Sequence, residues 1–326
     1  MGFLFLAVAC SLGIATIFKL AERRDLDRTA LLAVNYAAAA ALAVALDGAT
    51  GGRVPTGAVA LGVVQGVLFI GGFWLFSRAI REAGIGLAAG AMRLSVVVPV
   101  VAAWAVWNEV PTTLQLVGLA LAGAAFVLVA RPAGSPDATQ TVTGGVPAAT
   151  SAAALDVPVR KNASDALGVL LEREADSPRA PGVGLLLGAL FLAGGLVDVV
   201  MKAFQSGYGA AAPVPVPTAT FLLFVFGVAF AVGAIAVVWT GVRTGRWPGT
   251  AVIGWGLGLG VINYGSAEFL LRALGELRAP VAFPLNSVSI VLGAALLGRL
   301  VWGEHLSRAN VAGLGLAAVA VALLAR

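Results

Sequence analysis

Apolar runs long enough to cross a lipid bilayer are the feature that most constrains the fold of this chain. A helix needs about 20 residues to cover the roughly 30 Å hydrocarbon core at about 1.5 Å per residue. Ten such runs follow one another, and we expect helices over residues 3–21, 29–47, 56–77, 85–107, 112–130, 183–203, 217–240, 250–271, 280–301 and 307–325. The sequence therefore predicts an all-α integral membrane protein of about ten transmembrane helices.

Composition excludes several functional classes. Of the 326 residues, 60% are hydrophobic and 11% are charged, whereas soluble domains carry about a quarter charged residues. The net charge of +5 is spread between apolar runs and forms no basic stripe, so we expect no nucleic-acid partner. One cysteine (Cys10) and one histidine (His305) are too few for a zinc site, and we expect neither a metal nor a cofactor. The phosphate-loop pattern G-x-x-x-x-G-K-S/T is absent from the sequence, so ATP hydrolysis is not expected.

A polar stretch divides the apolar runs into two groups of five. Residues 132–182 are rich in Pro, Ser, Thr, Asp and Ala and contain no long apolar run. Within them only Asp165 to Ala175 has helical spacing. We expect a linker that is largely disordered.

The two groups of runs resemble each other. Trp107 to Arg131 overlays Trp302 to Arg326 without a gap. Other landmarks recur in the same order: Lys19 with Lys202, Arg53-Val54-Pro55 with Arg246-Trp247-Pro248, and Arg78-Ala79 with Arg272-Ala273. We therefore expect one five-helix repeat over residues 1–131 and a second over 183–326. An odd number of spans per repeat gives the copies opposite orientations, which is the inverted-repeat architecture of many secondary transporters.

The distribution of Lys and Arg predicts an orientation. With these helices, 15 of the 21 basic residues fall on the face that carries the linker and 5 on the other, and Arg93 lies inside the membrane. Cytoplasmic loops carry the excess of positive charge. The count predicts a cytoplasmic linker and two extracytoplasmic termini.

The ends of the two repeats resemble those of the EamA branch of the drug/metabolite transporter superfamily. They read SVVVPVVAAWAVWNEVPTTLQLVGLALAGAAFVLVA from Ser95 and SIVLGAALLGRLVWGEHLSRANVAGLGLAAVAVALLA from Ser289. Shorter signatures are similar to one bacterial subgroup: Asn35-Tyr36, Asn263-Tyr264-Gly265-Ser266 and Phe283-Pro284-Leu285-Asn286. The resemblance implies that the predicted helices one, three, four, six, eight and nine surround a central cavity and that five and ten lie at the periphery. It also implies cytoplasmic termini, which conflicts with the charge count.

Arg93 is the most exceptional polar residue in the predicted spans. It lies about six residues inside the fourth predicted helix, and a charge at such a depth needs a partner or water. It could contact an anionic solute together with the nearby Ser95. Alternatively, it could snorkel along its own stem or bond to exposed carbonyls.

Other polar residues lie near mid-membrane. Gln65, Asn263 and Tyr264 could contact solute or form interhelical hydrogen bonds, and Asn35 is expected to bond another helix. Trp74 is a candidate cavity wall. Three further candidates follow two prolines in the ninth predicted helix: Asn286, Ser287 and Ser289. Proline leaves backbone carbonyls without donors, and these could be satisfied by a solute and the neighbouring polar side chains. Alternatively, the helix is kinked but contacts no solute.

Two acids are candidates for proton or sodium coupling. Asp198 lies four residues before Lys202, which is also the spacing of an ion pair within one helix. Glu268 lies close enough to a helix end to reach water. Glu109 and Glu304 occupy equivalent loops before helices five and ten, where we expect them to stabilise the helix starts, with Thr112 and Ser307 as N-caps.

Together these patterns predict a carrier of the cell's inner membrane. It would move a small solute, anionic or zwitterionic, by alternating access, driven by a gradient or passively, and would not be an enzyme. The alternatives are a membrane-embedded enzyme acting on lipid-borne substrates and a non-transporting subunit of a lipid or glycan export assembly. The sequence leaves open whether the chain works alone or as a homodimer.

Overall fold

The computed structural model describes residues 1–24, 26–46, 54–129, 182–245, 247–303 and 306–325. All regular secondary structure in these ranges is helical. The helices are α1 (Gly2–Glu22), α2 (Arg28–Leu46), α3 (Thr56–Ala83), α4 (Ile85–Leu94), α5 (Val97–Trp107), α6 (Thr113–Val129), α8 (Val183–Tyr208), α9 (Thr218–Thr244), α10 (Thr250–Glu276), α11 (Ala279–Val301) and α12 (Arg308–Leu324). The predicted linker, 132–182, lies outside the described residues except for Gly182.

Seven helical segments in the described part of the chain are long and apolar enough to cross a membrane. They are α1, α2, α3, the stretch Leu87–Trp107 that joins α4 and α5, α8, α9 and α11. α6 and α12 are apolar but shorter, at 17 residues each. The 27-residue α10 is long enough but carries more glycine and polar residues. The chain is a multi-pass, all-helical membrane protein.

The helix predicted over 85–107 is two helices, because Pro99 interrupts its hydrogen bonding. Proline has no N–H to donate to the carbonyl four residues earlier, which is that of Ser95. The N–H of Val98 donates to that carbonyl instead, at 2.9 Å. The chain therefore turns at Ser95 and Val96 between α4 and α5.

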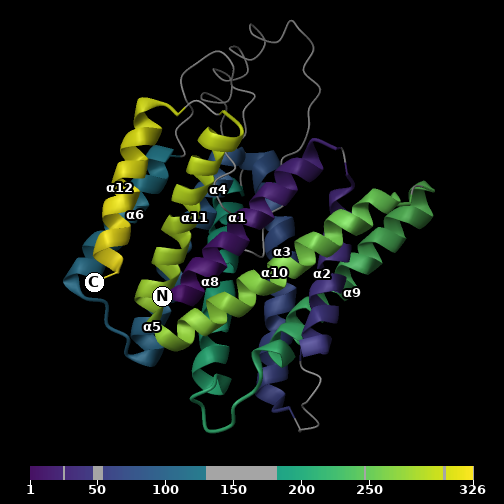
Figure 1. Cartoon of the computed structure of the whole chain (residues 1–326), viewed down its shortest axis with the longest axis horizontal. Coiled ribbons are helices and arrows are strands. Elements are labelled where there is room, and N and C mark those ends of the chain that lie inside the picture. The colour runs from purple at the N-terminus through teal and green to yellow at the C-terminus, as the bar shows by residue number, and fades with distance from the viewer. Residues whose placement is uncertain (25, 47–53, 130–181, 246, 304–305, 326) are drawn as a thin grey trace, which may run out of the picture.

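Six helix pairs form the most extensive contacts in the bundle (Figure 1). α6 packs along α12 in antiparallel direction, since Gly118 lies against Leu324 and Gly313 lies against Val129. α2 and α9 are also antiparallel, since Ala33 lies against Gly233 and the ring of Tyr36 stacks with that of Phe226. α10 packs along both α1 and α2, and α3 packs along both α8 and α9. The α6–α12 pair lies at one edge of the molecule, which is where the resemblance places the fifth and tenth predicted helices.

Two glycines allow helices to approach closely at equivalent places. A methyl group at Gly66 of α3 would lie 2.6 Å from the carbonyl oxygen of Val225 in α9. A methyl group at Gly260 of α10 would lie 2.5 Å from the carbonyl oxygen of Asn35 in α2. In both helices the residue four positions earlier is also a glycine against the same neighbour. Small residues of this kind let backbones pack tightly in membranes, where hydrophobic burial provides no drive.

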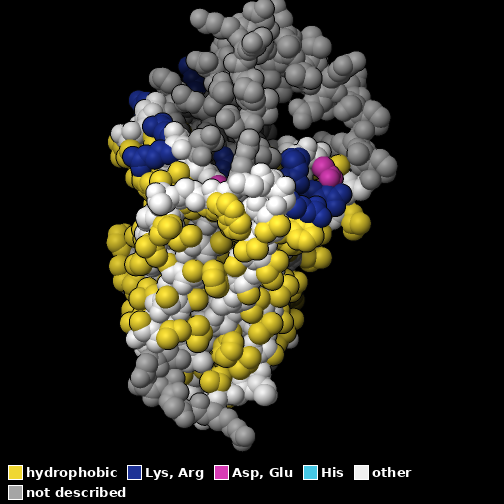
Figure 2. Space-filling view, turned by 90° about the vertical axis from the view of Figure 1, so that its right-hand side faces the viewer, with side chains coloured by type: hydrophobic (Ala, Val, Ile, Leu, Met, Phe, Trp, Pro, Cys, Tyr) yellow, Lys and Arg dark blue, Asp and Glu magenta, His cyan; other side chains and the backbone are white. Residues whose placement is uncertain are grey.

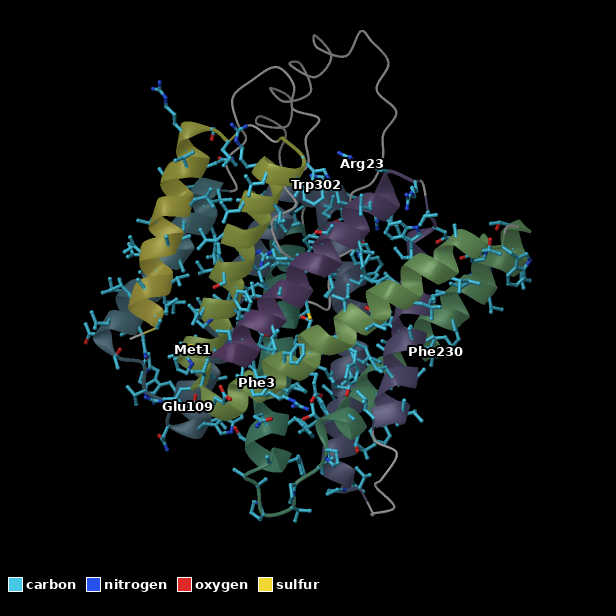
Figure 3. All side chains as sticks on the ribbon, viewed as in Figure 1. Met1, Phe3, Arg23, Glu109, Phe230 and Trp302 are labelled. Carbon is cyan, nitrogen blue, oxygen red and sulfur yellow. The ribbon has the colours of Figure 1, made fainter. Side chains whose placement is uncertain are left out.

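The two ends of the bundle differ in charge. Figure 2 shows Lys and Arg side chains gathered at one end, above a body whose surface is mostly apolar. Arg23 and Trp302 lie toward this end, whereas Met1, Phe3 and Glu109 lie toward the other (Figure 3). This separation of basic side chains from the apolar body is expected of a protein whose apolar surface lies in the bilayer.

Candidate functional site

An aromatic cluster marks the place where α2, α3, α9 and α10 meet. The ring of Phe226 lies 6.2 Å from that of Tyr36, 6.2 Å from that of Phe69 and 6.4 Å from that of Tyr264, centroid to centroid. We call these four residues the central aromatic cluster. All four are buried, so the cluster fixes the relative positions of the helices that carry the polar candidates.

Asn263 precedes Tyr264 of this cluster and bonds across to α2. Its Nδ2 donates to Oδ1 of Asn35 at 3.2 Å, and both residues are buried. This confirms that Asn35 bonds another helix. Oδ1 of Asn263 has no hydrogen-bond partner among the described residues, so one acceptor remains available at the cluster.

Gln65 lies on α3 one turn before Phe69 and is 1% exposed. Neither Oε1 nor Nε2 of its amide has a hydrogen-bond partner within the described ranges. A buried polar group without a partner costs about 1–3 kcal/mol. An amide held in this way is suited to bind a polar group that enters from outside the protein.

Glu268 continues the polar face of α10 towards the end that carries Met1. The hydroxyl of Tyr264 lies 3.5 Å from Oε2 of Glu268, and Nε of Arg272 donates to Oε1 at 2.7 Å. Glu268 is buried, whereas the Arg272 side chain is 53% exposed. The Glu268 carboxylate therefore contacts both Tyr264 of the central aromatic cluster and the exposed Arg272. Its role in ion coupling stays a prediction.

Lys202 does not form the expected pair with Asp198 in the described structure. Its Nζ lies 2.5 Å from Oε1 of Glu109, in the connection between α5 and α6. The other oxygen of Glu109 accepts from the N–H of Ala279 at 2.7 Å. Asp198 is half-buried on α8, and its coupling role also stays a prediction.

The expectation that Glu109 stabilises the start of its own following helix was therefore wrong. It caps α11, from the other half of the chain. The start of α6 is held instead by a reciprocal pair, since Thr112 Oγ1 accepts from the N–H of Gln115 and Oε1 of Gln115 accepts from the N–H of Thr112. Ser307 caps α12 as predicted, accepting from the N–H of Asn310 at 3.1 Å. Glu304 and His305 lie outside the described residues.

Arg93 and Ser95 lie at the break between α4 and α5. Neither of these helices contributes a residue to the central aromatic cluster. Both are buried. Ser95 Oγ donates to the carbonyl of Met92 at 2.6 Å and lies against Gly194 of α8. Arg93 occupies the last turn of α4, where a cation suits the negative end of the helix dipole.

The remaining candidates are scattered. Trp74 is 56% exposed on α3, which suits the lipid boundary. Pro284 lies inside α11. Two residues later, the buried Oδ1 of Asn286 has no hydrogen-bond partner in the described structure. Ser287 and Ser289 are half-buried on the same helix.

Sequence reasoning missed two contacts between segments that are far apart in the chain. Ser11 of α1 and Ser266 of α10 share a hydrogen bond of 2.9 Å, and Glu109 bonds Lys202 as described above. Local sequence does not indicate either pairing, so only the packing reveals them. Among the described residues no cluster of three or more His, Cys, Asp or Glu could hold a metal ion.

Comparison with known proteins supports the fold and leaves the activity open. No protein-family model matches the chain. An uncharacterized protein of Haemophilus influenzae is 22% identical over 326 aligned positions, which cover 95% of this chain and 93% of that protein. A solved structure, described as the crystal structure of a protein, matches with a TM-score of 0.66 and 16% identity, over 100% of this chain and 98% of the other.

Proposed function

We propose that this chain is a secondary transporter of a small polar solute, built from two inverted five-helix repeats of the EamA type. The first repeat comprises α1, α2, α3, α4 joined to α5, and α6, and the second comprises α8 to α12. The chain would span the inner membrane ten times and alternate between states open to either side. It would act as a carrier and not as an enzyme.

The observation that carries this proposal is the reciprocal packing of the two halves. α1 packs on α10, and α8, the equivalent of α1, packs on α3, the equivalent of α10. α2 packs on α10 as α9 packs on α3. The equivalent helices α2 and α9 lie antiparallel on each other, with Ala33 against Gly233 and Tyr36 against Phe226. A two-fold axis in the membrane plane generates such contacts, and carriers use it to exchange inward and outward states.

The contacts of Gly66 and Gly260 support the same relation. Each glycine packs on the carbonyl of a residue in the other repeat, and the two carbonyls, of Val225 and Asn35, belong to equivalent helices. Lys202 and Lys19 are also equivalent, and they lie at opposite ends of the bundle. Lys202 pairs with Glu109, and Lys19 lies 4.4 Å from the ring of Trp302. Each end of the bundle thus has a contact of an equivalent lysine with the other repeat, which suits a protein that opens one end at a time.

The solute-binding region that we propose lies beside the central aromatic cluster. Gln65 and Asn263 present amide atoms without partners in the described residues, and the aromatic rings supply apolar walls. Glu268, linked to Arg272, is the group we propose for ion coupling. Arg93 and Ser95 would act at the break between α4 and α5, with an anionic or zwitterionic solute as the cargo.

Reconstitution of the purified protein tests this proposal. Solutes that raise its thermal midpoint would first be selected from labelled amino acids, organic acids, sugars and nucleosides. Counterflow into proteoliposomes should then exceed that of protein-free vesicles. Gln65→Leu should abolish it, whereas Val64→Ala, at the neighbouring exposed position, should retain it. A solute that binds but is never carried by this chain alone would favour the export-subunit alternative, and one recovered in chemically altered form would favour the enzyme.

A further inference from the structure

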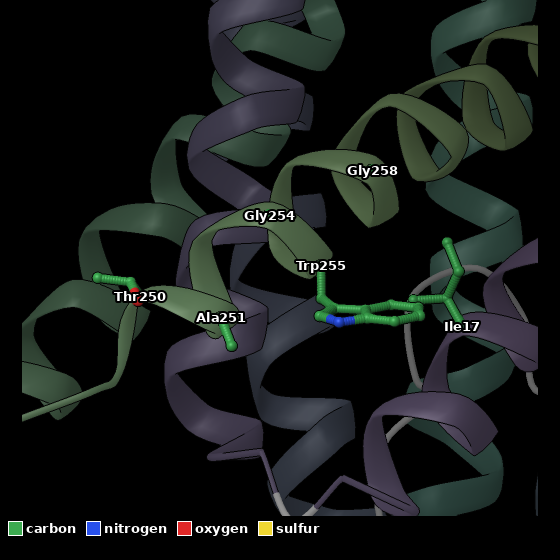
Figure 4. A pocket seen from close by; sticks show the side chains of 6 residues that line it. All are labelled: Ile17, Thr250, Ala251, Gly254, Trp255 and Gly258. Atoms are coloured by element: carbon green, nitrogen blue, oxygen red, sulfur yellow. The ribbon is translucent and has the colours of Figure 1, made fainter.

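An open groove lies on the outer surface between α1 and α10, near the end that carries Arg23. It has a volume of about 450 Å³ and is lined by Ile17, Thr250, Ala251, Gly254, Trp255 and Gly258 (Figure 4). Gly254 and Gly258 are exposed, and a methyl group at either would meet no atom within 4 Å. In this stretch of α10, Gly256 and Gly260 pack on α2, whereas Gly254 and Gly258 face outward.

The groove joins an apolar floor to a cationic rim. The guanidinium of Arg24 lies 4.6 Å from the ring centroid of Trp255, and Arg24 is exposed. α10 begins at Thr250, and its N-cap Gly249 has no side chain to accept the first N–H groups. The rim therefore offers guanidinium donors, a hydroxyl and the positive end of a helix dipole.

The dimensions and position of the groove fit a phospholipid. The stretch from Thr250 to Gly258 is about 12 Å long along the axis of α10, at about 1.5 Å per residue. α10 crosses the bundle obliquely (Figure 1), so the groove leads from the start of α10 toward the apolar body of the molecule. Trp255 lies at the boundary, where tryptophan is enriched. Basic pockets between transmembrane helices bind anionic headgroups. We propose that this groove binds one anionic phospholipid, with its phosphate at Arg24 and the start of α10 and an acyl chain along Gly254 and Gly258.

A second copy of the chain is a weaker occupant on electrostatic grounds. Two copies related by an axis along the membrane normal would bring identical rims together at the same depth. Arg24 of one copy would then face Arg24 of the other, and like charges at close range repel. A lipid phosphate instead complements the rim, and this binding does not depend on the proposed transport activity.

Native mass spectrometry of the full-length, delipidated protein tests the proposal with two probes, phosphatidylglycerol and phosphatidylcholine. We expect tighter binding of phosphatidylglycerol. Arg24→Gln should weaken that binding about fivefold and weaken the binding of phosphatidylcholine less, because its choline cation offsets the phosphate charge. Arg81→Gln is the matched control, because Arg81 is exposed in the last turn of α3 at the same end of the bundle and lines no part of the groove.

Gly258→Leu tests the acyl part of the groove separately. The position has open space around it, so the variant should fold and keep its thermal midpoint, yet it should weaken the binding of both lipids by filling the floor. Equal binding of the two lipids by the parent protein would overturn the proposal, as would an unchanged preference in the arginine variant. Efficient disulfide dimerisation of Gly254→Cys in vesicles would do the same, because it would identify a second copy as the occupant.

Discussion

Lys202 of α8 and Glu109 of the α5–α6 connection form a largely buried ion pair that joins the two halves of the chain. Their side chains are 8% and 16% exposed, and Nζ lies 2.5 Å from Oε1. Glu109 also accepts from the N–H of Ala279 at the start of α11. One carboxylate therefore ties three segments together: α8, the connection before α6, and α11. Little water reaches these groups to replace the contacts. The pair should therefore contribute more to the stability of the protein than an exposed salt bridge would.

Glu109→Gln should destabilise the protein markedly. It leaves the Lys202 ammonium buried without a countercharge, and breaking a buried pair in this way costs about 3–5 kcal/mol. Glu82→Gln is the matched control, since Glu82 pairs with Arg78 on the surface of α3 and exposed pairs contribute about 0–1 kcal/mol. Thermal midpoints in one detergent would compare them. Equal small shifts would show that water reaches the Lys202–Glu109 pair.

Removing both charges should recover part of that loss. In Glu109→Gln combined with Lys202→Met, no uncompensated charge remains, and the glutamine oxygen can still accept from Ala279. We expect the double variant to be more stable than Glu109→Gln alone, with a coupling energy of about 1–3 kcal/mol in the double-mutant cycle. Additive losses would mean that the two residues act independently.

Gln65→Leu should leave the thermal midpoint unchanged or raise it. Both amide atoms of Gln65 are buried without partners in the described structure, so an apolar side chain of similar size removes a desolvation cost and breaks no bond. Asn35→Leu should behave in the opposite way, because it removes the acceptor of the Asn263 amide and costs about 1–3 kcal/mol. A large destabilisation by Gln65→Leu would indicate that the amide has a structural partner, such as bound water, and would weaken its assignment to solute.

Gly66→Ala should destabilise the bundle, whereas Gly71→Ala on the same helix should not. The new methyl group at position 66 would meet the Val225 carbonyl at 2.6 Å, and a backbone atom can move aside only if α3 and α9 separate. Such overpacking costs about 1–3 kcal/mol. At position 71 nothing lies within 4 Å, and alanine favours the helix over glycine by about 1 kcal/mol. Midpoints that fall equally in both variants would contradict the close approach of α3 and α9.

Local patterns predicted the features that depend on local physics. Apolar runs located the helices, because each run must satisfy its own backbone in lipid, and the sequence signatures at Thr112 and Ser307 marked true N-caps. The partner of Lys202 could not be found in this way. Spacing favoured Asp198 on the same helix, but Glu109 lies 93 positions away along the chain and reaches Lys202 only through tertiary packing. The sequence also predicted one helix over 85–107, because its division into α4 and α5 depends on which N–H replaces the donor that Pro99 lacks.

The orientation of the bundle gives the last prediction. Basic residues outside the membrane divide 15 to 5 in favour of the end that carries the linker, and an excess of positive charge stays in the cytoplasm. The N-terminus lies at the opposite end, where its ammonium group is 2.9 Å from Oε2 of Glu276 at the close of α10. Both termini should therefore be extracytoplasmic. Alkaline phosphatase fused after Arg326 should be active, and a fluorescent protein that matures only in the cytoplasm should remain dark. The reverse pattern would place both termini inside, as the resemblance to EamA transporters implies. It would also mean that the loops' charge excess does not set the topology of this chain.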